Sequence, residues 1–580
     1  MLDATAVRVR TGPLLARVRP FWIEPWTPLG LLALLQWALV LGLALRVERN
    51  GWLFYQGGDQ TFLYSSAVVV GHGHLPEASV GYLWPIVLAP ITWVAGPNFI
   101  AGLPGILLLQ VLVLLPLGLL AIYGAASRIG GRLVGYLAAV VWVLAPHLTT
   151  SLFVARYHEK WFDLTLPQTL GLTGMGDFPS MVLLTVAAYF VLRLLDEGSD
   201  VDAVLAGVVT GLAIGLKPAN ALFLGGVILA LPLARRWRGG LVYGLALAPA
   251  FLTLALWKYR GLGALPIFSA SPAIREAAAA TLPTMPLAGI GGHYANFDWH
   301  RYRETIDSLR EVFWSRRLLE FIPLAGLIGA ARASWAKAAF LGGWFFAFFV
   351  VKTTRGTIDA ADWWRLMTPS WPAFLLLMCS LALLVPGVGG KLRERRPPEP
   401  GPARRWSRPL LVVLGVLTVV PLLLVVALPV QRAETAARIE AVDIPGQPPA
   451  TPDLMDSLDP SIELEAVRRG DRVVLRWHGG DPGRAAVFYH VLRARTVEPR
   501  PPAFSGIYGT AVDGLRCTSS GAPHCATWMT DLGSTREQAF VDKPGPGKWS
   551  YRVEVAGNFK DDLAGGDPLT YSKAARVTVP

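Results

Sequence analysis

The sequence predicts an α-helical polytopic membrane protein with about eleven spans, followed by an all-β sandwich domain. Three observations lead to this fold class. Of the 580 residues, 53% are hydrophobic and only 16% are charged, whereas soluble domains carry about 25% charged residues. Apolar runs long enough to cross a bilayer recur up to residue 430. From residue 463 onward, short alternating segments bounded by Gly, Pro and Asp replace them.

The net charge of +12 would by itself suit a nucleic-acid-binding protein. Its distribution indicates another partner. Residues 1–430 hold 35 basic and 22 acidic residues, and residues 431–580 hold 18 and 19. The surplus therefore lies in the loops between apolar runs, where Lys and Arg mark the cytoplasmic side of a membrane protein. We expect a lipid bilayer as a partner and no nucleic acid.

The apolar runs predict eleven spans between residues 28 and 430. They cover roughly 28–45, 99–123, 132–150, 178–195, 203–216, 219–234, 241–258, 319–332, 338–351, 369–386 and 409–429. A further apolar stretch, Tyr82 to Gly96, contains Pro85 and Pro90. We expect it to lie in the outer interface of the membrane rather than to cross.

The basic loops set the predicted orientation. With residues 1–27 in the cytoplasm, the loop 391–408, which has seven basic and two acidic residues, is also cytoplasmic. The acidic loop 196–202 is an exception, but acidic residues contribute little to orientation. The same side holds Arg128, Arg132, Arg235, Arg236, Arg238, Arg332 and Lys337. Residue 430 onward then lies outside a plasma (inner) membrane, as do loops 46–98, 151–177, 259–318 and 352–368.

The tail is predicted to contain a linker, 431–462, and a sandwich domain, 463–580. Its strands are RVVLRWHGG, AVFYHVLRAR, GKWSYRVEVAGN and SKAARVTVP, which alternate with a period of two. The domain resembles a fibronectin type III domain. Trp477 lies on an early strand, Tyr489 and Val491 on the central strand, Tyr551 where the tyrosine corner would be, and Ser572 at the start of the last strand.

Two cysteines, Cys517 and Cys525, enclose the segment CTSSGAPHC in this tail. In an exported domain such a close pair favours a disulfide. A zinc site is the alternative, but His524 supplies only one of the two further ligands that it would need.

The outer loops hold the residues that could perform chemistry. Asp59 follows two glycines in QGGDQTFLYSSA, where a helix would begin. It could cap that helix, or it could be a carboxylate at the membrane surface that accepts a proton from a hydroxyl group. Asp177 repeats this pattern in GMGDFP and leaves the same two interpretations open. If the two carboxylates are close, one could act as base while the other orients the acceptor.

Several segments resemble the GT-C superfamily of multi-pass glycosyltransferases, such as protein mannosyltransferases and aminoarabinose transferases. They are GGDQTFLYSSA with HGHLPEASVGYLWPIVLAP, SRIGGRLVGYLAAVVWVLAP, LTGMGDFPSMVLLTVAAYFVLRLLD, GLAIGLKPANALFL and DWWRLMTPSWPAFLLL. The resemblance covers roughly residues 20–390 and implies that a polyprenyl-phosphate-linked sugar is transferred, with inversion, to an extracytoplasmic acceptor. It places Asp59 and Asp177 in the catalytic site.

The resemblance also implies a site for the donor phosphate, for which Arg365, Lys217 and Arg355 have the required charge. Arg365 follows two tryptophans, so anchoring in the aromatic belt is its alternative role. An acceptor cleft could include Tyr64, His158, Glu159 and His293. Many family members have a second acid directly after the first, where this chain has Gln60. An amide oxygen is a weaker ligand for a hard cation, so we expect no metal cofactor.

Two other function classes are weighed against glycosyl transfer. A lipid or solute transporter should show repeated halves and ionisable groups near the middle of its spans, and neither pattern is evident. An inactive scaffold that only displays the β domain would not need eleven spans.

Overall fold

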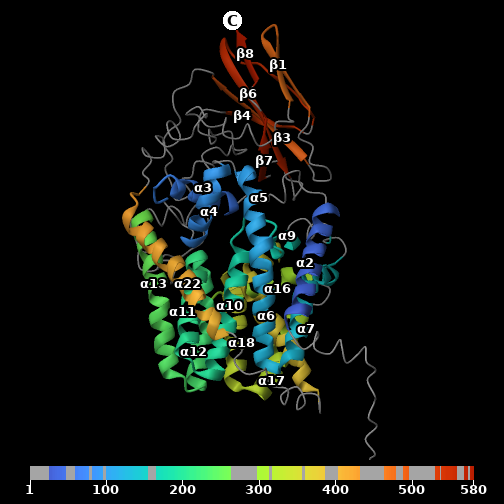
Figure 1. Cartoon of the computed structure of the whole chain (residues 1–580). Coiled ribbons are helices and arrows are strands. Elements are labelled where there is room, and N and C mark those ends of the chain that lie inside the picture. Colours follow the sequence, from blue (N-terminus) through green and yellow to red (C-terminus); the bar gives the residue numbers. More distant parts are fainter. Residues whose placement is uncertain are drawn as a thin grey trace, which may run out of the picture.

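The computed structural model describes residues 25–46, 59–76, 81–95, 99–154, 158, 165–262, 297–312, 317–355, 360–385, 403–430, 463–478, 487–495, 530–535, 537–557, 567–572 and 575–580. Within these ranges the chain is mostly helical up to residue 430 and forms strands beyond residue 463 (Figure 1). The predicted fold class, a polytopic helical protein with a C-terminal β domain, is confirmed. The predicted linker, 431–462, lies outside the described residues.

The helices follow the predicted order of apolar segments. The first group is α2 (Trp26–Arg46), α3 (Asp59–Gly71), α4 (Leu83–Ala95), α5 (Phe99–Leu109), η1 (Gln110–Leu114), α6 (Leu115–Gly130) and α7 (Arg132–Thr149). The central group is η2 (Thr150–Leu152), α9 (Leu166–Thr169), α10 (Asp177–Glu197), α11 (Asp200–Leu216), η5 (Pro218–Phe223), α12 (Leu224–Leu233) and α13 (Trp237–Leu262). The last group is α16 (Trp299–Val312), α17 (Arg317–Ala333), α18 (Trp335–Arg355), α19 (Ala360–Met367), η6 (Thr368–Ser370), α20 (Trp371–Ser380), η7 (Leu381–Leu384) and α22 (Ala403–Ala427).

Each of the eleven predicted spans coincides with a helix or a run of helical turns. Eight segments of the described chain are long and apolar enough to cross a membrane, so this is a multi-pass membrane protein. The other three predicted spans, 203–216, 219–234 and 319–332, coincide with shorter helices of at most 17 residues. The stretch predicted to lie in the interface forms the short helix α4, with Pro85 in its first turn.

Helix α10 is the centre of the bundle. Of its apolar segment 78% is buried, compared with 22% for α2 and for the span within α22. It packs against α6, α11 and η6, so the residue that begins it, Asp177, is enclosed by several elements. Helices α2 and α22 instead expose large apolar side chains, as expected for helices that face lipid.

A network of ion pairs joins α6, α10 and α18 at one end of the bundle. Arg128 donates to Glu197 at 2.6 Å, and the Lys337 ammonium lies 2.7 Å from the carboxylate of Asp196. Lys337 also donates to the carbonyl oxygen of Arg128. The carboxylates of the acidic loop that broke the predicted charge pattern therefore neutralise cations of the basic loops. The acidic and basic loops lie at the same end of the molecule.

The most enclosed pair in this network joins Arg193 and Asp202. The guanidinium Nε lies 3.1 Å from the carboxylate, and the Asp202 side chain is only 2% exposed. Because Asp202→Ala leaves the arginine buried without this partner, we expect the free energy of unfolding to fall by about 3 kcal/mol. The midpoint of thermal unfolding in detergent measures this loss. Asp200→Ala is the control, since it breaks the exposed pair with Arg238 and should change stability little. Equal losses in both variants would contradict the interpretation.

The opposite end of the bundle holds α3, α4 and the end of α22. In Figure 1, α3 and α4 lie at the end nearest the strands. The amide of Leu75, just after α3, donates to the carbonyl oxygen of Pro429 at 2.8 Å, and Leu75 forms a parallel bridge with Val430. The first predicted outer loop and the start of the tail are therefore adjacent.

The β domain consists of two antiparallel sheets. Its strands are β1 (Glu463–Arg469), β2 (Arg472–His478), β3 (Val487–Arg495), β4 (Thr530–Thr535), β5 (Ala539–Asp542), β6 (Gly547–Gly557), β7 (Asp567–Tyr571) and β8 (Ala575–Val579). One sheet has the order β1-β2-β5; the other has the order β4-β3-β6-β7, with β8 pairing to the first half of β6. Trp477 on β2 packs against Tyr489 on β3, with ring centroids 5.3 Å apart, so the sheets bury their inner faces against each other.

Four strands, β2, β3, β6 and β8, match the predicted segments. The strands β1, β4, β5 and β7 were not predicted. The predicted start of the last strand at Ser572 is wrong, because β8 begins at Ala575 and Ser572 instead accepts the amide of Val553 at 2.9 Å. Tyr551 donates to the carboxylate of Asp542 at 2.7 Å. Burial and this carboxylate raise the pKa of the Tyr551 hydroxyl, which therefore remains a donor at neutral pH. The fibronectin type III assignment remains a prediction.

Candidate functional site

Asp177 occupies the first position of α10 and pairs with a lysine from the neighbouring helix. Its carboxylate makes a salt bridge with the Lys217 ammonium, and the Asp177 side chain is only 4% exposed. The N-cap residue of α10 is Gly176, and no side chain makes a capping hydrogen bond there. Asp177 thus does not act as the N-cap that was one of its two predicted roles. It is a buried carboxylate with a cationic partner.

The position of Lys217 follows from the sequence Lys-Pro-Ala-Asn. A residue before proline avoids the helical conformation, and Lys217 accordingly ends α11 with extended backbone angles. Asn220 then fixes the turn. Its amide nitrogen Nδ2 donates to Ser180 of α10 at 2.9 Å and to the carbonyl oxygen of Ala213 at 2.7 Å. The turn is therefore attached to both helices that meet at the salt bridge.

Two further cations belong to the same group. Lys352, near the end of α18, is buried and interacts electrostatically with Lys217, Asp177 and Arg365. Arg365 lies on α19, directly after two tryptophans, as predicted. Among the described residues, the group that we call the cationic cluster combines Lys217, Lys352 and Arg365 with one carboxylate, that of Asp177. Three basic side chains around one carboxylate, with Lys352 buried, would be stabilised in their charged forms by an anionic ligand.

The loop before Asp177 is held by side chains from three other elements. Gln60 on α3 accepts the amide of Gly174 at 2.9 Å, and Gln110 on η1 donates to the carbonyl oxygen of Thr173 at 2.6 Å. The indole of Trp84 on α4 donates to the carbonyl oxygen of Gly174 at 3.1 Å. Because α3 begins at Asp59, the bond from Gln60 brings the starts of α3 and α10 together. The side chain of Asp59 itself lies outside the described parts of the structure.

The end of α11 is tightly packed against the segment between α3 and α4. A Cβ on Gly81 would lie 2.3 Å from the carbonyl oxygens of Gly215 and Leu216, so no side chain fits there. A Cβ on Gly215 would in turn meet the ring of Tyr82 at 2.4 Å. These close approaches bring the segment between α3 and α4 against the residues that directly precede Lys217.

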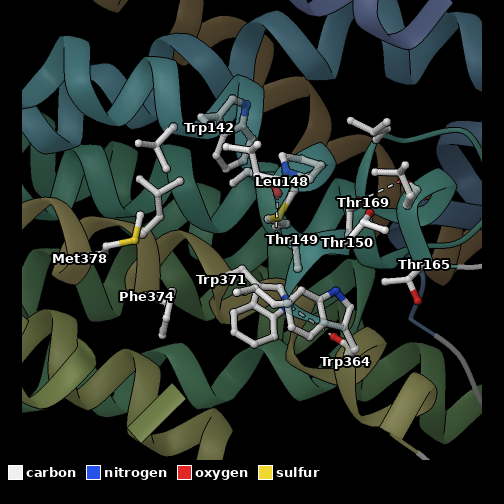
Figure 2. Close-up of a pocket in the computed structure, with 18 of the residues that line it drawn as sticks. Trp142, Leu148, Thr149, Thr150, Thr165, Thr169, Trp364, Trp371, Phe374 and Met378 are labelled. Carbon is white, nitrogen blue, oxygen red and sulfur yellow. Dashed lines mark hydrogen bonds between the residues drawn. The ribbon is translucent and has the colours of Figure 1, made fainter. Parts of the chain in front are cut away.

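An apolar cavity of about 480 Å³ is lined by sequence neighbours of the cationic cluster, although none of the charged residues of the cluster lies on its wall. Phe178, the neighbour of Asp177, and Trp364, the neighbour of Arg365, both line it. Figure 2 shows Trp364 next to Trp371, with Trp142 on the opposite side of the cavity. The two neighbouring rings have centroids 4.2 Å apart. Hydroxyl groups on the wall bond to backbone, as when Thr149 donates to the carbonyl oxygen of Ala145 at 2.6 Å. The cavity therefore suits a hydrocarbon chain.

The predicted acceptor residues are not brought together in the described structure. Tyr64 is fully buried, and its ring packs so closely on α5 that a Cβ on Gly102 would lie 2.5 Å from it. It is a core residue rather than part of an open cleft. His158 donates from Nε2 to the carbonyl oxygen of Phe153 at 2.8 Å, which is a local structural bond. Glu159, His293, Cys517, Cys525 and the side chain of Arg355 lie outside the described residues.

Lys352 is the site residue that the sequence analysis missed. It stands in FFAFFVVKTTR, close to the end of an apolar run and inside a helix long enough to cross the membrane. A single lysine at the end of a span usually extends to the interface, so the run gives no sign of a buried charge. The only available signal was its place at the end of a predicted span, because ionisable residues inside membranes are costly and usually functional.

No group of three or more His, Cys, Asp or Glu side chains is arranged as metal ligands within the described ranges. Gln60 uses its amide oxygen for the bond to Gly174, so this atom is engaged in the protein. Since Asp59 is described only in its backbone, metal independence remains a prediction.

Comparison with known proteins gives a distant likeness. No family model matches the chain, and neither does any curated protein. Among solved structures, the apo oligosaccharyltransferase of Archaeoglobus fulgidus is similar at 13% identity with a TM-score of 0.36, over 73% of this chain and 58% of that one. Its complex with an inhibitory peptide and a dolichol-phosphate gives 12% and 0.36 over the same shares, and the form tethered to an acceptor peptide gives 12% and 0.37. This chain thus spans less than two thirds of the length of those enzymes.

Proposed function

We propose that the protein is a membrane glycosyltransferase of the GT-C type that transfers a sugar from a polyprenyl-phosphate donor to an acceptor hydroxyl outside the plasma membrane. The observation that carries the proposal is the cationic cluster, in which Asp177 and Arg365 are the sequence neighbours of Phe178 and Trp364 on the wall of the apolar cavity. A polyprenyl phosphate has the matching chemistry, because an anionic group is joined to a long hydrocarbon chain. Lys217, Lys352 and Arg365 would bind the phosphate, and the cavity between α7 and α20 would hold the first prenyl units.

The reaction is a single displacement at the anomeric carbon. The acceptor oxygen forms a bond to that carbon while the bond to the phosphate oxygen breaks, and inversion follows. Asp59, at the start of α3, takes the proton of the acceptor hydroxyl. The electron pair of the broken bond stays on the prenyl phosphate, where the cationic cluster stabilises the developing charge. Asp177 keeps Lys217 oriented toward that group.

The helix starts of α3 and α10 support this arrangement. Helix N-termini carry partial positive charge and attract anions. Both helices begin near the loop that Gln60 binds, and α10 begins beside the cationic cluster. The proposed site faces the same end of the bundle as the tail, which is the outer side in the predicted topology. The tail would bind an acceptor or shield the site, since its acidic residues are scattered.

Binding to the purified full-length protein in lipid nanodiscs tests the proposal without knowledge of the acceptor. We expect a labelled polyprenyl monophosphate to bind saturably and the matching polyprenol, which lacks the phosphate, to bind at least about tenfold more weakly, as the loss of one charged contact would give. Equal binding of both lipids, or binding of neither, would contradict a phosphate site. With a radiolabelled sugar on the lipid and cell-envelope extract as acceptor source, label should leave the lipid only when the protein is present.

A further inference from the structure

Two glutamines hold one peptide group from opposite sides. The peptide between Thr173 and Gly174 offers its N–H to Gln60 Oε1 at 2.9 Å and its carbonyl oxygen to Gln110 Nε2 at 2.6 Å. Both side chains are fully buried, and they come from segments 50 residues apart in the sequence. This pair of bonds, which we call the peptide clamp, fixes the rotation of that peptide about the chain axis.

The peptide clamp lowers the stability of the fold, and packing alone would not require it. Gln60 Nε2 and Gln110 Oε1 are buried and have no hydrogen-bond partner among the described residues. Leaving such groups unpaired costs about 1–3 kcal/mol each. Apolar side chains of similar shape would avoid this penalty. The arrangement therefore resembles a site in which position is maintained at the expense of stability.

The loop between the peptide clamp and Asp177 depends on contacts with other elements to keep one conformation. It consists of Gly174, Met175 and Gly176, and two glycines in three residues leave the backbone many conformations. Trp84 adds a third bond, to the carbonyl oxygen of Gly174. Beyond the loop, the Asp177 carboxylate pairs with Lys217 in the cationic cluster. A rotation of the clamped peptide would move the first turn of α10 and with it this carboxylate.

We propose that Gln60 is a positioning residue that fixes the start of α10, with Asp177, relative to the start of α3, with Asp59. This inference rests on the proposed function, because it assigns a purpose to the distance between the two carboxylates. Gln60 acts through Asp59 and Asp177 and does not itself touch the substrate.

The test compares variants of Gln60 in the sugar-transfer assay. Gln60→Met keeps the size of the side chain and removes the acceptor for Gly174. We expect kcat to fall about 100-fold, the effect of a misplacement of about 1 Å, with the KM for the donor lipid unchanged. Gln60→Glu retains an oxygen that accepts the amide and should recover most of kcat. Gln110→Met should resemble Gln60→Met, and the double variant should be little worse than either, because the two residues hold the same peptide.

Thr185→Val is the control. It removes another buried side-chain hydrogen bond of α10, the one to the carbonyl oxygen of Met181 at 2.7 Å, far from the loop. We expect unchanged kcat. Three results would overturn the positioning role: a wild-type kcat in Gln60→Met, a rise in KM alone, or strictly additive effects in the double variant. The proposed function would still stand in these cases if the wild-type protein transfers sugar. A wild-type protein that neither binds the prenyl phosphate nor transfers sugar would overturn both.

Discussion

We expect the replacement of Asp59 by Asn to suppress sugar transfer strongly and to leave the protein folded. The amide has the shape of the carboxylate but cannot accept the proton of the acceptor hydroxyl. A general base contributes about 100- to 10,000-fold to a rate, so we expect kcat to fall by about 1,000-fold. Binding of the polyprenyl monophosphate should persist, because the cationic cluster is intact. Steady-state transfer and lipid binding, measured on the same nanodisc preparation, give both values.

Asp307→Asn is the matched control for this change. Asp307 lies on α16 and pairs with Arg310 at 2.6 Å, in an exposed position outside the proposed site. Its variant should transfer sugar at the wild-type rate. An Asp59→Asn protein that remained fully active would eliminate this residue as the base, and Asp177, the other predicted catalytic carboxylate, would then be the next candidate for the role.

We expect Lys352→Met to reduce transfer by about 100-fold, because the variant lacks a basic group of the cationic cluster that, in the proposed function, stabilises the negative charge on the leaving phosphate. The variant should also weaken binding of the prenyl phosphate while it leaves binding of the polyprenol unchanged. Methionine fills the volume of the lysine stem and removes the cost of a buried charge, so the helix α18 should stay in place. Isotherms for both lipids and the value of kcat measure the effect.

Lys258 provides a close control for Lys352. It is also a buried lysine near the C-terminal end of a spanning helix, α13. Lys258→Met removes the same chemical group without removing a cation from the cationic cluster. We expect it to bind and transfer as the wild type does. Equal losses in the two variants would mean that the Lys352 effect is structural.

Much of the membrane region could be predicted because its helices follow from local sequence patterns. Apolar length gave the eleven helical segments, and the Gly-Asp pairs gave the starts of α3 and α10. Lys217 and Arg365 could be selected because ionisable residues at the membrane boundary of the predicted outer loops are functional candidates. The acidic loop 196–202 seemed to break the charge pattern only because its partners, such as Arg128 and Lys337, are distant in sequence.

The rest depends on contacts between distant segments. Nothing near Lys352 indicates that the end of α18 meets the start of α10, and this encounter is what makes its charge part of the site. The role of Gln60 is equally non-local, since its partner lies 114 residues away. In the tail, strands such as β4 and β7 contain Gly or Pro and do not alternate clearly, so only their pairing with β3 and β6 defines them.

A density map of the protein with a bound polyprenyl monophosphate tests the central claim most directly. The account predicts a phosphate within about 4 Å of at least two of Lys217, Lys352 and Arg365, with the prenyl chain entering the cavity beside Phe178 and Trp364. A phosphate bound instead at the opposite end, against Arg128 and Lys337, would contradict it.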